Sequence, residues 1–198
     1  PLYMSIPFAL VLRDGRAFGT FFDNPCMSRF HVGAPLPGVF IYTVPGGELD
    51  LYVVEGPLVN DVVERYTSLT GRMPMPPRWS LGYHQSRWSY KDEKEVRDIA
   101  DGFRKKGIPI DCIHLDIHHM EKYRSFTFHK KRFPDPKRLA DDLHKQGIKL
   151  MSIIDPGVSA DPDFDLYQEG KEKAYFCRDE DGWEFNAQVW PVKAAFPD

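Results

Sequence analysis

The chain has 198 residues, a net charge of −3 at pH 7, 42% hydrophobic residues and 14% aromatic residues. This composition supplies enough apolar side chains for one large packed domain or two small ones, and it argues against a disordered chain. A slightly acidic balance without a basic tract argues against nucleic acid as a partner. The sequence contains neither an apolar run of roughly 18 residues nor a secretory signal pattern, so we expect no membrane partner.

The cysteines and the chain ends give two further expectations. Cys26, Cys112 and Cys177 are odd in number and widely spaced, which indicates reduced thiols and a cytoplasmic protein rather than a disulfide framework. The chain opens on Pro1 and stops after Phe196-Pro197-Asp198 without a closing element. We therefore expect it to be part of a longer polypeptide.

Residues 1–60 have the pattern of an antiparallel sheet. Apolar stretches at 2–12 and 17–22 are each followed by turn residues, which predicts two short strands. Residues 39–44 and 49–54 flank Pro45-Gly46-Gly47, and we predict that they pair as a hairpin.

A junction follows, between residues 56 and 78. Residues 61–69 have helical spacing and end at Gly71, and the prolines of segment 73–77 exclude helix. We treat 61–78 as a linker helix and a proline-rich segment.

Residues 79–198 begin with an alternation of strands and helices. We predict strands at 79–84, 112–117 and 148–154, with helices at 91–106 and from Asp135-Pro136 to Gly147. Ser89 and Asp92 have the spacing of a capping box at the first of these helices. Strands joined by helices in this order run parallel and form an α/β sheet. Three such strands cannot close a barrel, but they could start one.

Polar side chains follow each of the three predicted strands. The segments are 84–88, which holds His84, Arg87 and Trp88, then 116–119, beginning with Asp116, and finally Asp155-Pro156. Parallel α/β sheets place their sites at these strand ends, although polarity also resumes wherever a strand stops.

Two chemistries are compatible with these residues. His114, Asp116 and His118 alternate and would share one strand face, which admits zinc or iron. Residues i and i+4 are about 13 Å apart on a straight strand, so all three cannot hold one ion, and we expect no metal. His119 would face the other way and pack or lie at the surface.

Carboxylates and aromatic side chains would instead suit a sugar. Asp116 and Asp155 follow neighbouring strands, and glycosidases that retain configuration use two carboxyl groups about 5–5.5 Å apart. Asp155 precedes a proline, so we predict that it caps the turn after its strand. Among the aromatic residues, which mostly build cores, we single out Trp190 as a binding residue.

Several segments resemble glycoside hydrolase family 31, in the order in which that family has them. The long block that carries this resemblance is residues 66–88, which includes Trp79-Ser80-Leu81-Gly82-Tyr83-His84. Shorter matching blocks are residues 115–120, Phe133-Pro134-Asp135, 153–156, 189–191 and 196–198, and segments 2–8 and 18–24 are similar to the end of the family's β-sandwich.

The resemblance implies a retaining, exo-acting α-glucosidase-type hydrolase without a metal or cofactor, acting on an oligosaccharide or α-glucoside. Its fold would be the end of an antiparallel β-sandwich (1–60) followed by the first strands and helices of a (β/α)8 barrel (79–198). Asp116 would accept hydrogen bonds from the terminal sugar, and Ile117, Ile153 and Trp190 would wall the same subsite. His118 replaces a second Asp of many members, and Val192 replaces the usual Gly after Trp-Pro.

The family's nucleophile lies in a Trp-x-Asp-Met-Asn-Glu-like motif, which does not occur in these 198 residues. The acid/base motif is also absent. Because the covalent step needs a carboxylate nucleophile, we predict that this polypeptide alone has no glycosidase activity. Two alternatives are a non-catalytic carbohydrate-binding or interaction module, and a metal-dependent barrel hydrolase that uses His114, Asp116 and His118.

Overall fold

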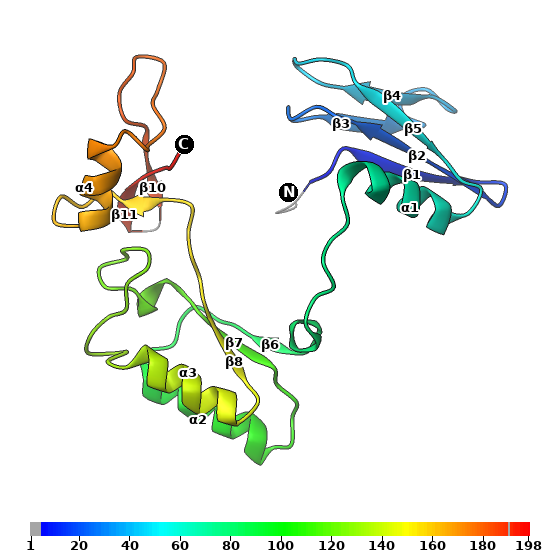
Figure 1. Cartoon of the computed structure of the whole chain (residues 1–198). Coiled ribbons are helices and arrows are strands. Elements are labelled where there is room, and N and C mark those ends of the chain that lie inside the picture. The colour runs from blue at the N-terminus through cyan, green and yellow to red at the C-terminus, as the bar shows by residue number, and fades with distance from the viewer. Residues whose placement is uncertain (1–4, 190) are drawn as a thin grey trace. The chain divides into compact units, whose positions relative to one another are not determined.

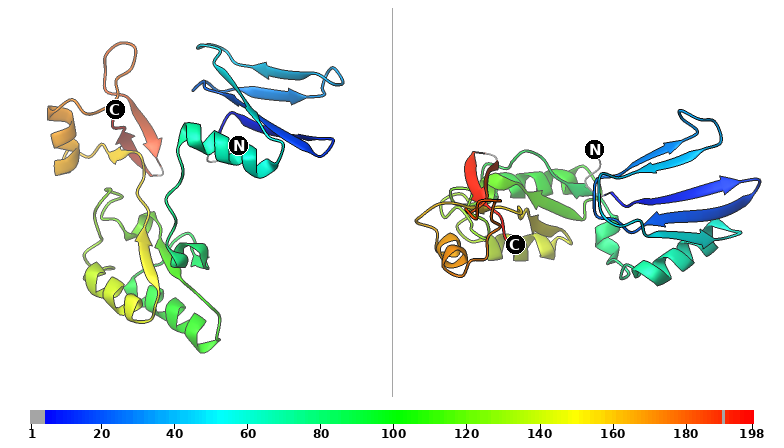
Figure 2. Two further views of the ribbon diagram at one scale, coloured as in Figure 1. Left: turned by 45° about the vertical axis from the view of Figure 1, so that its right-hand side comes forward. Right: turned by 90° about the horizontal axis from the view of Figure 1, so that it is seen from above.

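The computed structural model describes residues 5–189 and 191–198, which form two compact units divided between Met75 and Pro76. Figures 1 and 2 show both units. The strands and helix of the first unit are β1 (Phe8–Arg13), β2 (Arg16–Phe22), β3 (Arg29–Val32), β4 (Phe40–Thr43), β5 (Leu51–Glu55) and α1 (Val59–Thr70).

The first unit is built on the antiparallel sheet β1-β2-β5, with α1 lying along one face (Figure 1). Val62 of α1 is buried against Ala17 and Val54 of the sheet. Gly19 allows this close approach, because a Cβ atom there would lie 2.9 Å from a Val62 methyl group. The strands predicted at 17–22 and 49–54 and the helix predicted at 61–69 are therefore confirmed, with the helix spanning Val59–Thr70.

The predicted hairpin between residues 39–44 and 49–54 is wrong. Strand β4 pairs with β3, for which the sequence shows no strand pattern, and β5 pairs with β2. The side-chain amide of Asn24 donates hydrogen bonds to the carbonyl groups of Gly46 (3.1 Å) and Glu48 (2.9 Å), which fixes the intervening loop. The pairing of β3 with β4 is supported by Phe22, whose ring stacks on Tyr42 with centroids 3.8 Å apart.

The second unit begins with the strand–helix alternation that the sequence predicts. Its elements are a 3-10 helix (Arg78–Leu81), β6 (His84–Gln85), α2 (Glu93–Lys105), β7 (Cys112–Leu115), a second 3-10 helix (Ile117–His119), α3 (Pro136–Lys145) and β8 (Lys149–Ser152). Strands β6, β7 and β8 form a parallel sheet in that order, so the predicted parallel connections are confirmed.

The predicted strand at 79–84 is mostly wrong. Residues 78–81 form a 3-10 helix that begins after Pro77 and ends at Gly82, and only His84 and Gln85 pair with β7. The strand is cut short because prolines 76 and 77 lead the chain directly into the 3-10 turn. The indole of Trp79 stacks on the His84 ring, with centroids 5.9 Å apart.

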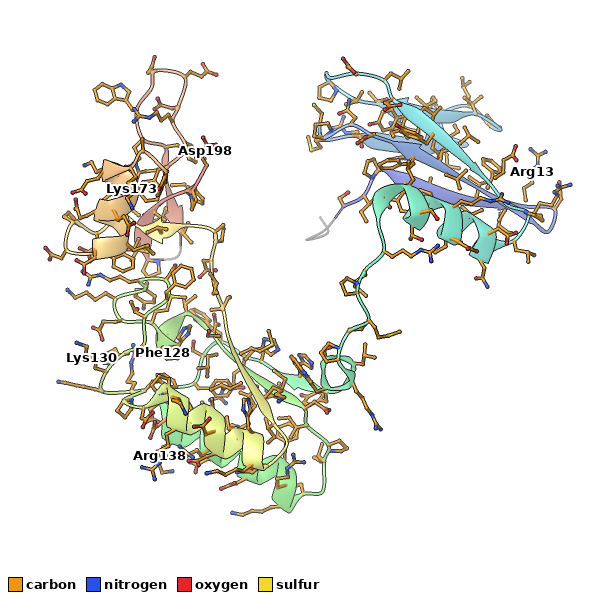
Figure 3. The ribbon with its side chains drawn as sticks, in the orientation of Figure 1. Arg13, Phe128, Lys130, Arg138, Lys173 and Asp198 are labelled. Carbon is orange, nitrogen blue, oxygen red and sulfur yellow. The ribbon has the colours of Figure 1, made fainter. Side chains whose placement is uncertain are left out.

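Helices α2 and α3 lie side by side on one face of the parallel sheet (Figures 1 and 2). Their apolar stripes, with Val96 and Leu139 at the centre, are buried against Ile113 and Leu115 of β7. Phe128 packs against the same core, whereas charged side chains such as Lys130 and Arg138 are exposed (Figure 3).

Both helices begin at capping aspartates. Asp92 accepts a hydrogen bond from the Glu95 amide, and Asp135 accepts one from the Arg138 amide, both at 2.9 Å. Asp135 with Pro136 thus starts α3 as predicted. Ser89 takes no part in capping α2, because its hydroxyl group contacts His118 instead.

The remaining elements were not predicted from the sequence. They are β9 (Val158–Ser159), α4 (Asp165–Glu172), β10 (Asn186–Val189) and β11 (Val192–Ala195), with β10, β11 and β9 forming a small antiparallel sheet. Tyr167 of α4 is buried in one apolar cluster with Phe164 and Phe176, which flank the helix, and with Val158 and Ala195 of the sheet. Within the described residues, no helix is both long enough and apolar enough to cross a membrane.

Candidate sugar-binding site

The carboxyl ends of β6, β7 and β8 meet at one edge of the parallel sheet, where they border an open cavity of about 470 Å³. Its lining residues are Ser86, Arg87, Trp88, His114, Leu115, Asp116 and Ile153. Polar groups from the first two predicted strand ends are therefore brought together, as the parallel connections required.

Asp116 is held rigidly at the start of the 3-10 helix that follows β7. Its Oδ1 accepts a hydrogen bond of 2.7 Å from the Ile117 amide. Its carbonyl oxygen accepts bonds from the His119 amide (3.0 Å) and from the His119 ring Nδ1 (2.8 Å). Within residues 5–189 and 191–198 no donor is bonded to its Oδ2. This oxygen is available to accept a hydrogen bond from a ligand.

Of the other residues predicted to bind, Ile153 lines the cavity and Ile117 does not. Ile153 is 37% exposed, and its amide donates to the Leu115 carbonyl at 3.0 Å, which extends the pairing of β7 with β8. Ile117 is 5% exposed, and its described contribution is the amide that holds Asp116. Trp190 lies outside the described residues.

Trp88 is a wall residue that the sequence analysis did not single out. It lines the cavity and is 82% exposed, with its ring centroid 6.3 Å from that of His118. The His118 ring is held in turn by Ser89, because the Nδ1 of His118 lies 2.8 Å from the Oγ of Ser89. An exposed indole beside a carboxylate offers both an apolar face and a hydrogen-bond acceptor to a ligand. The signal in the sequence was the position of Trp88 directly after a strand end.

Asp155 does not cap a turn, contrary to the prediction. Its Oδ2 is buried, and it has no hydrogen-bond partner among the residues that the structure describes. Burial raises the pKa of the Asp155 carboxyl group above its usual value, and the negative charge of Asp116 raises it further. Asp155 does not line the cavity, but its carboxyl group interacts electrostatically with the anchored Asp116 and holds its proton more tightly.

His119 is packed, as the sequence analysis expected. It is 3% exposed, and its ring lies 5.0 Å from that of Phe128. Burial lowers the pKa of His119, which keeps the ring neutral while its Nδ1–H donates to Asp116. His119 thus supports the backbone of Asp116 and has no contact with the cavity.

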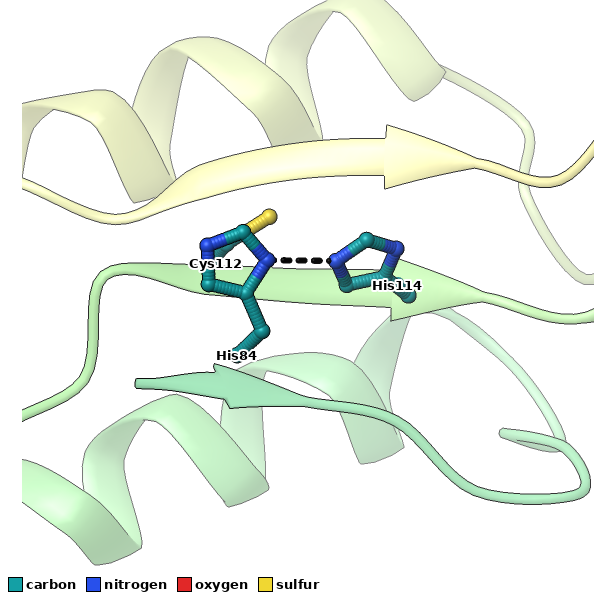
Figure 4. Close-up of side chains that lie close together, drawn as sticks. All are labelled: His84, Cys112 and His114. Atoms are coloured by element: carbon teal, nitrogen blue, oxygen red, sulfur yellow. Dashed lines mark hydrogen bonds between the residues drawn. The ribbon is translucent and has the colours of Figure 1, made fainter. Parts of the chain in front are cut away.

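The proposed metal ligands His114, Asp116 and His118 do not come together as one group. Asp116 lies directly before a 3-10 helix and His118 lies within it, so neither is on the strand, and His118 contacts Ser89. His114 instead meets His84 of β6, with its Nε2 2.9 Å from the His84 Nδ1, next to the buried Cys112 (Figure 4).

A parallel sheet covered by helices, with a pocket at the carboxyl ends of its strands, defines the class of α/β proteins that bind ligands at that edge. Residues 73–198 match the family model for the glycosyl hydrolases family 31 TIM-barrel domain. The chain belongs to glycosyl hydrolases family 31, which confirms the resemblance seen in the sequence.

Relatives in this family are named as α-glucosidases. The chain is 50% identical to "Alpha-glucosidase 2" of Bacillus thermoamyloliquefaciens and 40% identical to "Alpha-glucosidase" of Saccharolobus solfataricus. These matches cover 100% of the chain but 25% and 28% of the relatives, so the chain spans about a quarter of their length.

Solved structures agree with this assignment. The α subunit of glucosidase II matches 99% of the chain with a TM-score of 0.90 and 31% identity, over 23% of its own length. A family 31 α-glucosidase from Bacteroides thetaiotaomicron matches 99% of the chain with a TM-score of 0.87 and 38% identity, over 33% of its length.

Proposed function

We propose that this chain supplies part of the terminal-sugar subsite of a retaining, exo-acting α-glucosidase-type hydrolase. The observation that carries the proposal is Asp116, anchored through Oδ1 and its carbonyl group while Oδ2 has no described partner beside the cavity. A carboxylate oxygen in this setting accepts hydrogen bonds from sugar hydroxyl groups. The names of the relatives support an α-glucoside as the substrate.

We further propose that Ile153 and Trp190 wall this subsite and that Ile117 acts through the amide that positions Asp116. Trp88 adds an exposed aromatic face to the same cavity. At the level of the fold, the first unit is the end of a β-sandwich, and β6, β7 and β8 with their helices are the start of a (β/α)8 barrel. The family model and the parallel strand order support this proposal.

Bond cleavage requires a nucleophile that the chain does not carry in the family's motif. The chain alone should therefore bind an α-glucoside without hydrolysing it. A carbohydrate-binding module would also bind without turnover. The hydrolase and the binding module can therefore be distinguished only when the motif that holds the family's nucleophile is supplied.

A chimera distinguishes the hydrolase from the binding module. The corresponding quarter of the 50%-identical Bacillus relative is replaced by this chain, and hydrolysis of p-nitrophenyl α-glucoside is measured. We expect activity, and we expect Asp116→Asn to lower kcat/KM roughly 10- to 150-fold, the effect of losing a charged hydrogen bond worth about 1.5–3 kcal/mol.

Asp101→Asn, on the exposed side of α2, is the matched control and should leave kcat/KM unchanged. A folded but inactive chimera would favour the binding module. A chimera in which Asp116→Asn and Asp101→Asn behave alike would remove Asp116 from the subsite.

A further inference from the structure

We propose that His84, Cys112 and His114 form a binding site for a transition-metal ion of the zinc type. The three side chains come from β6 and β7, and they project from one face of the parallel sheet (Figure 4). His114 also lines the cavity of the proposed sugar subsite, but the inference rests on the cluster of three side chains and not on the binding of a sugar.

The strand geometry explains why these residues meet. Cys112 and His114 are two residues apart on β7, so their side chains point to the same face. His84 pairs with Cys112 in the parallel register of β6 and β7, which places it on the adjacent strand. Ile113 and Leu115 point the other way, into the helix-covered core. The cluster therefore lies on the face opposite to α2 and α3.

The distances suit a single ion. One ligand atom from each residue can be chosen so that all three lie within 4.8 Å of one another, and the His84 Nδ1 and His114 Nε2 are 2.9 Å apart. Tetrahedral zinc, with bonds of about 2.0–2.1 Å to nitrogen and 2.3 Å to sulfur, separates its ligand atoms by about 3.3–3.6 Å. The 2.9 Å distance is shorter than this range and the 4.8 Å limit is longer, so ligand atoms that move by about one ångström would seat the ion.

The cluster is not a satisfied polar network without an ion. The two imidazoles can share one hydrogen bond, but the Nε2 of His84 stays buried with no partner among the described residues. The Cys112 thiol is fully buried, and its described hydrogen bond is a long one of 3.8 Å to the Ile113 carbonyl. Buried polar groups normally have partners, so the thiol with its long hydrogen bond points to a missing ligand, and either ring nitrogen of His84 can supply a ligand atom.

The donor set selects the kind of metal. Two imidazoles and a thiolate favour zinc and similar borderline or soft ions over magnesium or calcium, which prefer oxygen. Three protein ligands leave a fourth position for water, as in open zinc sites. Binding ionises Cys112, and its proton is released to the solvent.

Cobalt(II) is the probe, because it replaces zinc and reports its ligands by absorption. The metal-free full chain is titrated with Co²⁺, and we expect one equivalent to bind with a thiolate-to-cobalt charge-transfer band, which Zn²⁺ then removes. Cys112→Ser should abolish the band. His114→Gln should weaken binding at least about tenfold, since even outer partners of a metal site contribute 10- to 100-fold.

Cys177→Ser is the matched control, because Cys177 is a free thiol outside the cluster. It should keep the band and the affinity, and circular dichroism verifies that each variant is folded. No cobalt binding by folded wild-type chain, or a band that survives in Cys112→Ser, would overturn the proposal.

If Cys112→Ser does not fold, X-ray absorption at the zinc edge of the wild-type chain gives the answer. One sulfur and two imidazole ligands would support the site, and a shell of oxygen and nitrogen alone would overturn it.

Discussion

The two faces of the parallel sheet in the second unit differ in what they contribute. On β7, Ile113 and Leu115 point to the face that α2 and α3 cover, and both are buried in the largest apolar cluster described. Cys112 and His114 point to the other face, where polar contacts replace apolar packing. Because side chains alternate along a strand, one four-residue segment serves both faces.

The helix-covered face stabilises the fold, whereas the opposite face and the strand ends carry the groups that could bind a ligand. The helix-covered face gains free energy from burying apolar side chains and from two well-formed helix starts. The opposite face and the strand ends keep groups whose burial is costly, such as the Nε2 of His84 and the Oδ2 of Asp155. We infer that the first face stabilises the arrangement that the second face and its strand ends require.

The largest expected effect tests the helix-covered face. Ile113→Ala removes a fully buried side chain from the core, and we expect the free energy of unfolding to fall by about 2–5 kcal/mol. Met151→Ala is the matched comparison. Met151 lies on β8, pairs with His114 of β7 and is 41% exposed. Chemical denaturation followed by circular dichroism measures both variants.

Met151→Ala should cost far less than Ile113→Ala, because little buried area is lost. If the two substitutions were equally destabilising, the two faces would contribute alike to stability, and the proposed separation would fail.

Much of the helix-covered face could be predicted from the sequence. Helices α2 and α3 have long apolar periodicities and capping aspartates, and strands β7 and β8 lie in segments rich in apolar residues. The strands β3 and β4 were harder, because their pairing depends on an aromatic cluster around Phe22 rather than on a local turn. The short strands β9 and β10 follow no strong pattern of their own.

The opposite face could be predicted only in part. Asp116 was recognised because it directly follows an apolar strand. The meeting of His84 with Cys112 and His114 depends on the register between β6 and β7, and a single strand's sequence does not contain that register. Likewise, the proline after Asp155 is a local signal that predicts a turn. The burial of Asp155 and its interaction with Asp116 depend on the tertiary structure, which this local signal does not contain.

A smaller effect tests whether the helix-covered face depends on its helix starts. Asp135→Ala removes the carboxylate that accepts from the Arg138 amide, and we expect a loss of about 1 kcal/mol of unfolding free energy. Asp135→Asn is the control, because asparagine caps a helix as well as aspartate does and should retain most of the stability. Equal losses in both variants would show that the charge, not the cap, is what α3 needs.

The smallest expected effect concerns the strand ends and is seen in its dependence on pH. Because the folded-state pKa of Asp155 is raised by burial and by Asp116, ionising it costs folding free energy. The wild-type chain therefore loses this stability as the pH rises from the unfolded carboxyl pKa through the folded one. Asp155→Asn cannot ionise, so its melting temperature relative to wild type should rise between pH 4 and pH 7.

The change with pH distinguishes this effect from a packing defect, because a badly accommodated amide would shift the melting temperature equally at every pH. Asp101→Asn on the exposed side of α2 provides the reference curve, which should run parallel to wild type. A difference between Asp155→Asn and wild type that stays constant from pH 4 to pH 7 would mean that Asp155 ionises as easily in the folded chain as in the unfolded one. The strand ends would then carry no electrostatic cost, and the contrast with the helix-covered face would rest on packing alone.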